Sequence, residues 1–171
     1  YFSKIDIALI AQGSLVKIDN NEDDEIYKIY ESHSINFLSA AMITSEICNH
    51  MAKKKSGKII GIGSVAGDRG RKSNYIYGSA KGAFDIYLEG LRQKYSTFNI
   101  NILCVKPGLI DTPMTKEFKK NFLWARPITV ARDIIKANNK NRSVIYTPWF
   151  WFFILLIIKI IPTKIFKKLN L

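Results

Sequence analysis

Residues 58–64 read Lys-Ile-Ile-Gly-Ile-Gly-Ser, a short apolar run that ends at a hydroxyl-bearing residue. A run of this length, bounded by a turn signal, predicts a buried strand. Residues 5–11 and 100–105 have the same character, and Gln-Gly and Pro-Gly turns follow them. Helical patterns fill the intervals, over about residues 24–52 and 75–96. Strands that alternate with helices of more than a dozen residues predict an α/β fold with a doubly wound parallel sheet.

The first predicted helix is amphipathic. Its apolar residues recur at roughly helical spacing. They are Ile26, Ile29, Ile35, Leu38, Met42 and Ile47. Three lysines at residues 53–55 end it, since cations are favourable near a helix C-terminus.

Positive charge is concentrated in the last third of the chain. Residues 1–113 hold 14 Lys/Arg and 12 Asp/Glu, whereas residues 114–171 hold 12 Lys/Arg and two acids. This asymmetry predicts an anionic partner for the C-terminal part. We do not expect nucleic acid, because neither zinc-ligand spacings nor an RNP-like aromatic pattern accompanies the charge. Cys48 and Cys104 are 56 positions apart and predict buried thiols, with no disulfide framework and no metal site.

Tyr77 and Lys81 are four residues apart in the second predicted helix, so the phenol and the ammonium lie on one face. A phenol with a pKa of about 10 exchanges protons poorly at neutral pH, and a nearby cation favours its ionised form. The pair therefore predicts a tyrosine with a lowered pKa for acid–base chemistry, although such a pair is common on its own.

Ser64 stands 13 residues before Tyr77, at the end of the central strand. The carboxyl end of a parallel strand faces the crevice where ligands of such sheets bind. A hydroxyl there can donate to a carbonyl oxygen that gains negative charge, or it can cap a turn.

A strand ending in Gly-x-Ser, a Tyr-x-x-x-Lys pair and a strand ending in Pro-Gly together resemble the short-chain dehydrogenases/reductases, whose sheet is Rossmann-like with three αβα layers. Asn36 stands at the family's helix asparagine, and residues 107–112 (Pro-Gly-Leu-Ile-Asp-Thr) resemble its Pro-Gly segment. Residues 11–13 (Ala-Gln-Gly) depart from the family's Asn-Ala-Gly, which puts the adenosine-side contacts there in doubt. The resemblance covers residues 5–114, the catalytic part of the family.

The resemblance implies an NADP- or NAD-dependent oxidoreductase that transfers hydride between the nicotinamide and a carbonyl or hydroxyl group. It implies catalytic roles for four residues: Asn36, Ser64, Tyr77 and Lys81. It implies cofactor contacts for seven: Gly13, Tyr77, Lys81, Pro107, Gly108, Ile110 and Thr112. No metal is implied. The family's glycine-rich phosphate turn is absent from the chain, so we expect the first three strands, on the order of 80 residues, to precede Tyr1. We expect the isolated chain to be inactive and one strand edge to be exposed.

Residues 149–161 form an apolar stretch interrupted only by Lys159. A helix of this length spans roughly 20 Å, which is short of the ~30 Å hydrocarbon core of a membrane. Trp149 and Trp151 at its start and lysines near its end are typical of an interfacial anchor. We therefore divide the chain into a partial catalytic domain (1–147) and a membrane-associating tail (148–171), with packing in an oligomer interface as the alternative for the tail.

The tail also resembles that of the reductases acting on decaprenylphosphoryl-2-keto-ribose, enzymes of cell wall biosynthesis. That likeness implies a lipid-linked sugar substrate, with Arg69, Arg71 or Lys72 as candidates to meet its phosphate. It also implies a cytoplasmic protein held peripherally at the inner face of the membrane. The alternatives are a keto reductase for sphingoid, retinoid or steroid-like lipids, and a catalytically silent scaffold. Family likeness further implies a homodimer or homotetramer at full length.

Overall fold

The computed structural model describes residues 4–15 and 25–169. Their strands form one fully parallel sheet in the order β1-β2-β3-β4. The strands are β1 (Ile7–Ile10), β2 (Gly57–Ile62), β3 (Ile100–Pro107) and β4 (Val144–Thr147). The predicted α/β class and the three strands are thereby confirmed, each strand to within a few residues. The predicted burial holds for β2 and β3 but is wrong for most of β1, which lies at an edge of the described sheet.

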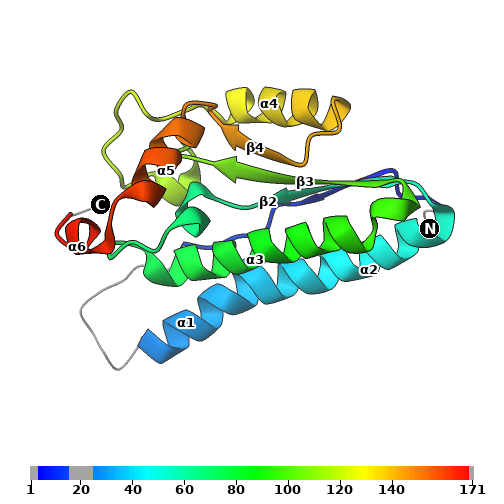
Figure 1. Ribbon diagram of the computed structural model, residues 1–171, viewed down its shortest axis with the longest axis horizontal. Helices are drawn as coiled ribbons and strands as arrows, with labels where there is room; N and C mark the ends of the chain where they lie inside the picture. The colour runs from blue at the N-terminus through cyan, green and yellow to red at the C-terminus, as the bar shows by residue number, and fades with distance from the viewer. Residues whose placement is uncertain (1–3, 16–24, 170–171) are drawn as a thin grey trace.

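Helices cover both faces of the sheet and complete three layers (Figure 1). One face carries α1 (Glu25–His33), α2 (Ser39–Lys54) and α3 (Tyr75–Lys94), and the other carries α4 (Pro127–Asn139). The first face holds the larger core, where Phe84 and Leu88 of α3 pack with Ile59 and Ile102 of the strands. On the second face Ala137 packs against the opposite side chains of β2 and β3.

The predicted helix over residues 24–52 is continuous but not uniform. A π-helical segment, Ser34–Leu38, joins α1 to α2. The predicted start at Asp24 lies outside the described residues. Around this segment the side chains that face the sheet are small or polar, among them Ser32, Asn36 and Thr44, all fully buried.

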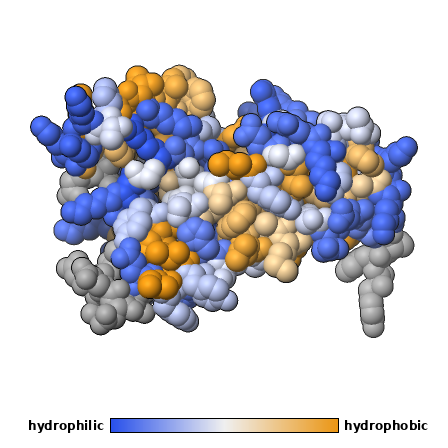
Figure 2. Space-filling model, turned by 60° about the horizontal axis from the view of Figure 1, so that its bottom comes forward, coloured by the Kyte–Doolittle hydropathy of each residue, from blue (hydrophilic) through white to orange (hydrophobic). Residues whose placement is uncertain are grey.

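Four of the six apolar residues in the predicted pattern are exposed: Ile26, Ile29, Leu38 and Met42. Ile26 is 83% exposed and Met42 is 70% exposed. Figure 2 shows apolar patches on the face that carries α1 and α2. The helical periodicity therefore marks mainly an outer surface of the chain, although Ile47 packs against the core.

β1 is an edge strand of the described sheet, and its hydrogen-bonded neighbour there is β2. Ile7 and Leu9 on one of its faces are more than half exposed, whereas Ile10 on the other face is buried against α2. The expectation of an exposed strand edge agrees with this arrangement.

The apolar stretch near the C-terminus folds into α5 (Trp151–Ile160) and the short α6 (Thr163–Phe166). α5 packs beside β4 and beside the loop that follows β2, burying Trp151 and Leu155 against Val65. Its other side is open: Phe153, Ile157 and Ile160 are 53%, 61% and 72% exposed. None of the helices among the described residues is both long and apolar enough to cross a membrane.

Candidate active site

The loop after β2 is held flush against α3 by glycines. A short 3-10 helix, Val65–Asp68, follows Ser64, whose Oγ accepts a hydrogen bond of 3.1 Å from the Ala66 N–H. A Cβ on Gly67 would lie 2.7 Å from the backbone nitrogen of Gly82, and one on Gly78 would lie 2.8 Å from the carbonyl oxygen of Ala66. Side chains at these positions would force the loop off the helix. The glycines thus bring Ser64 to the helix that carries Tyr77.

The Ser64 hydroxyl lies close enough to the Tyr77 phenol to affect its pKa. Burial raises the pKa of the Tyr77 phenol, and the Ser64 hydroxyl opposes that rise. The Lys81 amine lies 6.0 Å from the centre of the Tyr77 ring. Tyr77 therefore lacks the lowered pKa expected of it, because burial of the phenol outweighs the effect of Ser64. The role expected of Lys81 toward the phenolate stays a prediction.

Lys81 joins the ends of two strands. Its Nζ donates to the carbonyl oxygen of Ile62, at 3.0 Å, and to that of Gln12, at 3.3 Å. The side chain is buried, and burial lowers the pKa of its amine to about 8, although Asp85 opposes the shift. Lys81 is therefore charged at neutral pH and loses its proton in mild alkali.

Asn36 fixes the segment that follows β1. Its Oδ1 accepts from the backbone N–H of Ser14 at 3.0 Å, and its Nδ2 donates to the Ser14 carbonyl at 2.9 Å and to the Ser32 carbonyl at 3.0 Å. The π-helical segment presents the amide to this loop. Gly13 lies beside it: a Cβ there would stand 3.2 Å from Asn36 Oδ1 and 3.4 Å from Lys81 Nζ. Asn36, Gly13 and Lys81 therefore converge, although 68 positions separate Gly13 from Lys81 in the sequence.

The segment after β3 is shaped by its own hydrogen bonds. Gly108 N donates to the Thr147 carbonyl at 3.0 Å, and the residues on either side of Ile110 pair with Ala125. Thr112 begins a 3-10 turn and shares a reciprocal capping arrangement with Thr115. The segment that leaves the carboxyl end of β3 thus contains four of the predicted cofactor contacts: Pro107, Gly108, Ile110 and Thr112. These contacts stay a prediction.

Comparison of the sequence with known protein families identifies the family of the chain. The family model for short-chain dehydrogenases matches residues 2–122. The chain belongs to the short-chain dehydrogenase family.

Individual relatives in this family are distant. An uncharacterized oxidoreductase of Mycobacterium tuberculosis is 24% identical over 165 residues, covering 96% of this chain and 66% of the relative. A 3-oxoacyl-(acyl-carrier-protein) reductase of Chlamydia trachomatis is 33% identical over 92 residues, covering 53% of this chain and 37% of the relative. A short-chain dehydrogenase of Sphingobium yanoikuyae, solved in complex with NADPH, has the same fold with a TM-score of 0.74 at 17% identity, covering 86% and 59%. The chain therefore spans at most about two thirds of the length of these relatives.

Three residues near the carboxyl ends of the strands are candidates to hold the nicotinamide end of a dinucleotide, and this assignment stays a prediction. The Lys81 amine supplies a donor there, and Gly13 leaves the space beside that amine free of a side chain. The hydroxyl of Thr112 supplies a further polar group in the segment after β3. No glycine-rich phosphate turn occurs in the sequence, so the candidate contacts of this chain are those to the nicotinamide end.

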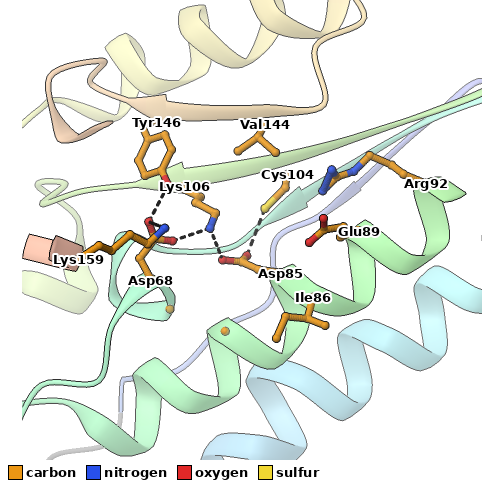
Figure 3. A pocket seen from close by; sticks show the side chains of 12 residues that line it. Asp68, Asp85, Ile86, Glu89, Arg92, Cys104, Lys106, Val144, Tyr146 and Lys159 are labelled. Carbon is orange, nitrogen blue, oxygen red and sulfur yellow. Dashed lines mark hydrogen bonds and ion pairs between the residues drawn. The ribbon is translucent and has the colours of Figure 1, made fainter. Parts of the chain in front are cut away.

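A buried charge cluster adjoins the site and was not predicted from the sequence (Figure 3). Lys106 pairs with Asp68 at 2.5 Å and with Asp85 at 3.0 Å, and Cys104 donates from its thiol to Asp85. Asp85 follows Lys81 by four residues on α3, and a Cβ on Gly63 would come within 2.3 Å of its carboxylate. The i, i+4 spacing from Tyr77 through Lys81 to Asp85 is the sequence signal that could have revealed it.

Arg69 does not serve the role expected of it. The sequence offered Arg69, Arg71 and Lys72 as candidates to meet an anionic substrate group. Arg69 instead donates to the backbone carbonyls of Ile158, Lys159 and Ile161 at the end of α5. Arg71 and Lys72 keep the predicted role as a hypothesis.

Proposed function

We propose that this chain is the catalytic part of an NADP- or NAD-dependent oxidoreductase that interconverts a carbonyl and a hydroxyl group. The observation that carries the proposal is the close packing of the Ser64 loop on the helix of Tyr77, beside the buried amine of Lys81 at the carboxyl ends of β1 and β2. Ligands of open α/β sheets bind at this end of the strands. Membership of the short-chain dehydrogenase family supports the same chemistry.

Each proposed catalytic residue has a distinct task in reduction. The Ser64 hydroxyl donates a hydrogen bond to the substrate carbonyl oxygen, where negative charge develops. The Tyr77 phenol gives its proton to that oxygen, and Lys81, charged below a pKa of about 8, stabilises the phenolate that remains. Asn36 holds the loop of Ser14 in place and supports the path by which the proton is replaced.

The nicotinamide supplies or accepts the hydride when bound. Lys81 and Tyr77 are the residues best placed to hold its ribose. Gly13, Pro107, Gly108, Ile110 and Thr112 form the rest of the proposed contact set. Relatives of the same fold, such as the Sphingobium dehydrogenase, are described in complex with NADPH.

Replacing Tyr77 by phenylalanine in the full-length protein tests the assignment. We expect turnover of a carbonyl substrate to fall at least a thousandfold, while NADPH still binds, because the phenylalanine keeps the ring and loses only the proton donor. A Tyr77→Phe variant with substantial activity would refute the mechanism.

For the substrate we propose a polyprenyl-phosphate-linked or cell-surface sugar, reduced in cell wall biosynthesis at the inner face of the membrane. The exposed apolar side of α5 and the lysines that follow it, Lys164, Lys167 and Lys168, support this choice. A helix with an apolar side and nearby cations suits the interface of an anionic membrane. The protein would then be cytoplasmic and peripherally bound, with residues 148–171 as the membrane-associating part.

The same surface favours a second class of substrate, a keto group on a sphingoid, retinoid or steroid-like lipid. The two classes differ in charge, since the phosphate of the first needs a cation near the site. Substituting Arg71 by alanine would weaken turnover of a phosphorylated substrate and leave that of a neutral lipid ketone unchanged. A catalytically silent scaffold is disfavoured because Asn36, Ser64, Tyr77 and Lys81 are all present.

Self-association is also part of the proposal, as a homodimer or homotetramer of the full-length protein. The exposed apolar residues of α1 and α2, such as Ile26 and Met42, form a surface that pairing would cover. Light scattering of the full-length Met42→Glu variant tests it, with dissociation expected. An unchanged mass for that variant would exclude α1 and α2 as the interface.

A further inference from the structure

Two consecutive residues, Asp68 and Arg69, connect the loop that bears Ser64 to four other elements: β3, β4, α5 and α6. They stand at the end of the short helix that begins directly after Ser64. On its other side this loop rests on α3 through Gly67 and Gly82. The loop is therefore clamped from two sides, and Asp68 and Arg69 form the side away from α3.

Arg69 fastens the loop to the end of α5. Its guanidinium donates to the carbonyl oxygens of Ile158, Lys159 (3.2 Å) and Ile161 (2.8 Å) at the C-terminal end of α5, where a helix leaves carbonyls in need of partners. The guanidinium also lies 3.7 Å from the centre of the Phe166 ring in α6. A planar fork of donors that also stacks on a ring is a task for arginine and not for lysine. Arg69 therefore holds both C-terminal helices at once.

Asp68 fastens the same loop to β3, β4 and α5. Its carboxylate is completely buried and accepts from the Tyr146 hydroxyl at 2.6 Å. It also pairs with Lys106 at 2.5 Å and with Lys159 at 3.1 Å (Figure 3). Burial by itself would raise the pKa of this carboxyl, but Lys106 and Tyr146 hold it below its usual value. Asp68 is thus a charged hub whose partners come from three elements.

α5 contacts two segments of the candidate active site. Trp151 and Leu155 pack on Val65, the residue after Ser64. The Trp151 indole also lies close against Gly108, where a Cβ would come within 1.9 Å of its Nε1. One helix thus contacts both the Ser64 loop and the Pro-Gly segment that follows β3.

We propose that Asp68 and Arg69 are positioning residues for Ser64, and that they hold α5 as a wall of the active site. This inference rests on the proposed function, because it assigns Ser64 a role in turnover. Breaking the clamp frees the loop to move away from Tyr77, so the substrate carbonyl loses its aligned donor. We expect this loss of turnover to act through Ser64.

Hydrogen exchange in the full-length protein tests the clamp without reference to activity. In Arg69→Ala we expect the amides of Val65, Ala66 and Gly67 to exchange at least tenfold faster, together with those of α5. Arg132→Ala is the matched control, since Arg132 is exposed on α4. Asp68→Asn keeps the size of the side chain and gives a second variant in case Arg69→Ala unfolds. Unchanged exchange at residues 65–67 in both variants would overturn the proposal.

A double-mutant cycle then separates positioning from general damage. With NADPH and 2-decanone as the carbonyl probe, removal of an aligned donor costs roughly a hundredfold to a thousandfold in kcat. We expect Arg69→Ala to lower kcat at least tenfold, with little change in the affinity for NADPH. In the Ser64→Ala background the same change should cost less than twofold. Additive losses would contradict action through Ser64.

The two proposals fail differently. The double substitution Phe153→Ser with Ile157→Ser changes only the exposed apolar side of α5. It leaves Asp68 and Arg69 unchanged, so it does not test the clamp. If Tyr77→Phe stays active, the proposed function fails while the hydrogen-exchange result still decides the clamp. If Tyr77→Phe is inactive but exchange at residues 65–67 is unchanged in both clamp variants, the clamp alone is wrong.

Discussion

Gly67 and Gly82 meet backbone to backbone: a Cβ on Gly67 would lie 2.7 Å from the Gly82 nitrogen, and one on Gly82 would lie 2.9 Å from the Gly67 carbonyl oxygen. No flexible side chain stands between them to yield. The distance between the loop of Ser64 and the helix of Tyr77 is therefore set by the absence of two side chains. The approach of the Ser64 hydroxyl to the Tyr77 phenol depends on that distance.

Adding one methyl group at this contact should separate the two groups. We expect Gly82→Ala to lower the free energy of unfolding by about 1–3 kcal/mol, the usual cost of overpacking, and to reduce turnover of the full-length protein. Urea denaturation measures the first effect. Gly90→Ala is the matched control on the same helix, because a Cβ there meets nothing within 4 Å. It should stabilise by about 0.5–1 kcal/mol, since alanine suits a helix interior better than glycine. Equal effects of the two substitutions would contradict the role of the contact.

The alkaline limb of activity should follow Lys81. Its pKa of about 8 means that the amine is charged below that pH and neutral above it, so activity that needs the cation falls as the pH rises through 8. Asp85 favours the charged amine. In Asp85→Asn that support is lost and the Lys106 cation is no longer balanced by Asp85, so the limb should move to lower pH.

The profile of kcat/KM against pH in the full-length protein measures this shift. Asp6→Asn serves as the control, because Asp6 is an exposed carboxylate paired with Lys4 on the surface. A limb that stays in place in Asp85→Asn would show that Asp85 does not govern Lys81.

Asn36 should be needed in its amide form. It is fully buried, and its Nδ2 donates to the carbonyls of Ser14 and Ser32. A carboxylate of the same shape cannot donate and would bury a charge, so Asn36→Asp should lower the free energy of unfolding by about 1–3 kcal/mol near neutral pH. Asn139→Asp at the exposed end of α4 is the control, with an expected change within about 0.5 kcal/mol. Urea denaturation of both variants that gave equal midpoints would contradict the proposed anchoring.

The strands and helices could be predicted because each carries a local signal. Apolar runs bounded by turns marked β1, β2 and β3, and helical periodicity marked α2 and α3. The direction of an apolar face could not be predicted in the same way. Ile26 and Met42 belong to a regular pattern, yet they point away from the sheet, while Ser32 and Asn36 face it. Periodicity shows that a face exists, but the contact with the rest of the chain decides which face is buried.

In the candidate active site, too, local spacing predicts some contacts and not others. Tyr77 and Lys81 are one helical turn apart, so their proximity follows from spacing. The π-helical segment at Asn36 arises where the chain must meet Ser14, and the cluster of Asp68, Asp85 and Lys106 draws on three elements. The partners in these contacts are distant in sequence and meet only when the chain has folded, so no local pattern predicts them. Arg69 illustrates the consequence, because its charge suggested a substrate anion and its neighbours in space are the carbonyls of α5.

The exposed side of α5 should determine binding to membranes. Phe153 and Ile157 are more than half exposed and adjoin the basic end of the chain. Burying an apolar side chain of this size contributes about 1.5–3 kcal/mol, so the double change Phe153→Ser with Ile157→Ser should weaken binding of the full-length protein to phosphatidylglycerol vesicles at least tenfold. Ile135→Ser on α4 is the matched control, as Ile135 is 61% exposed but lies away from the tail.

Binding of the unaltered protein should weaken when salt is added, because salt screens the attraction of Lys164, Lys167 and Lys168 to anionic lipid. It should also weaken when neutral phosphatidylcholine replaces phosphatidylglycerol, because the lysines then meet no anionic lipid. Vesicle sedimentation that gave the same partitioning for both variants would assign α5 to a protein interface, where a second copy of the chain and not lipid covers its apolar side.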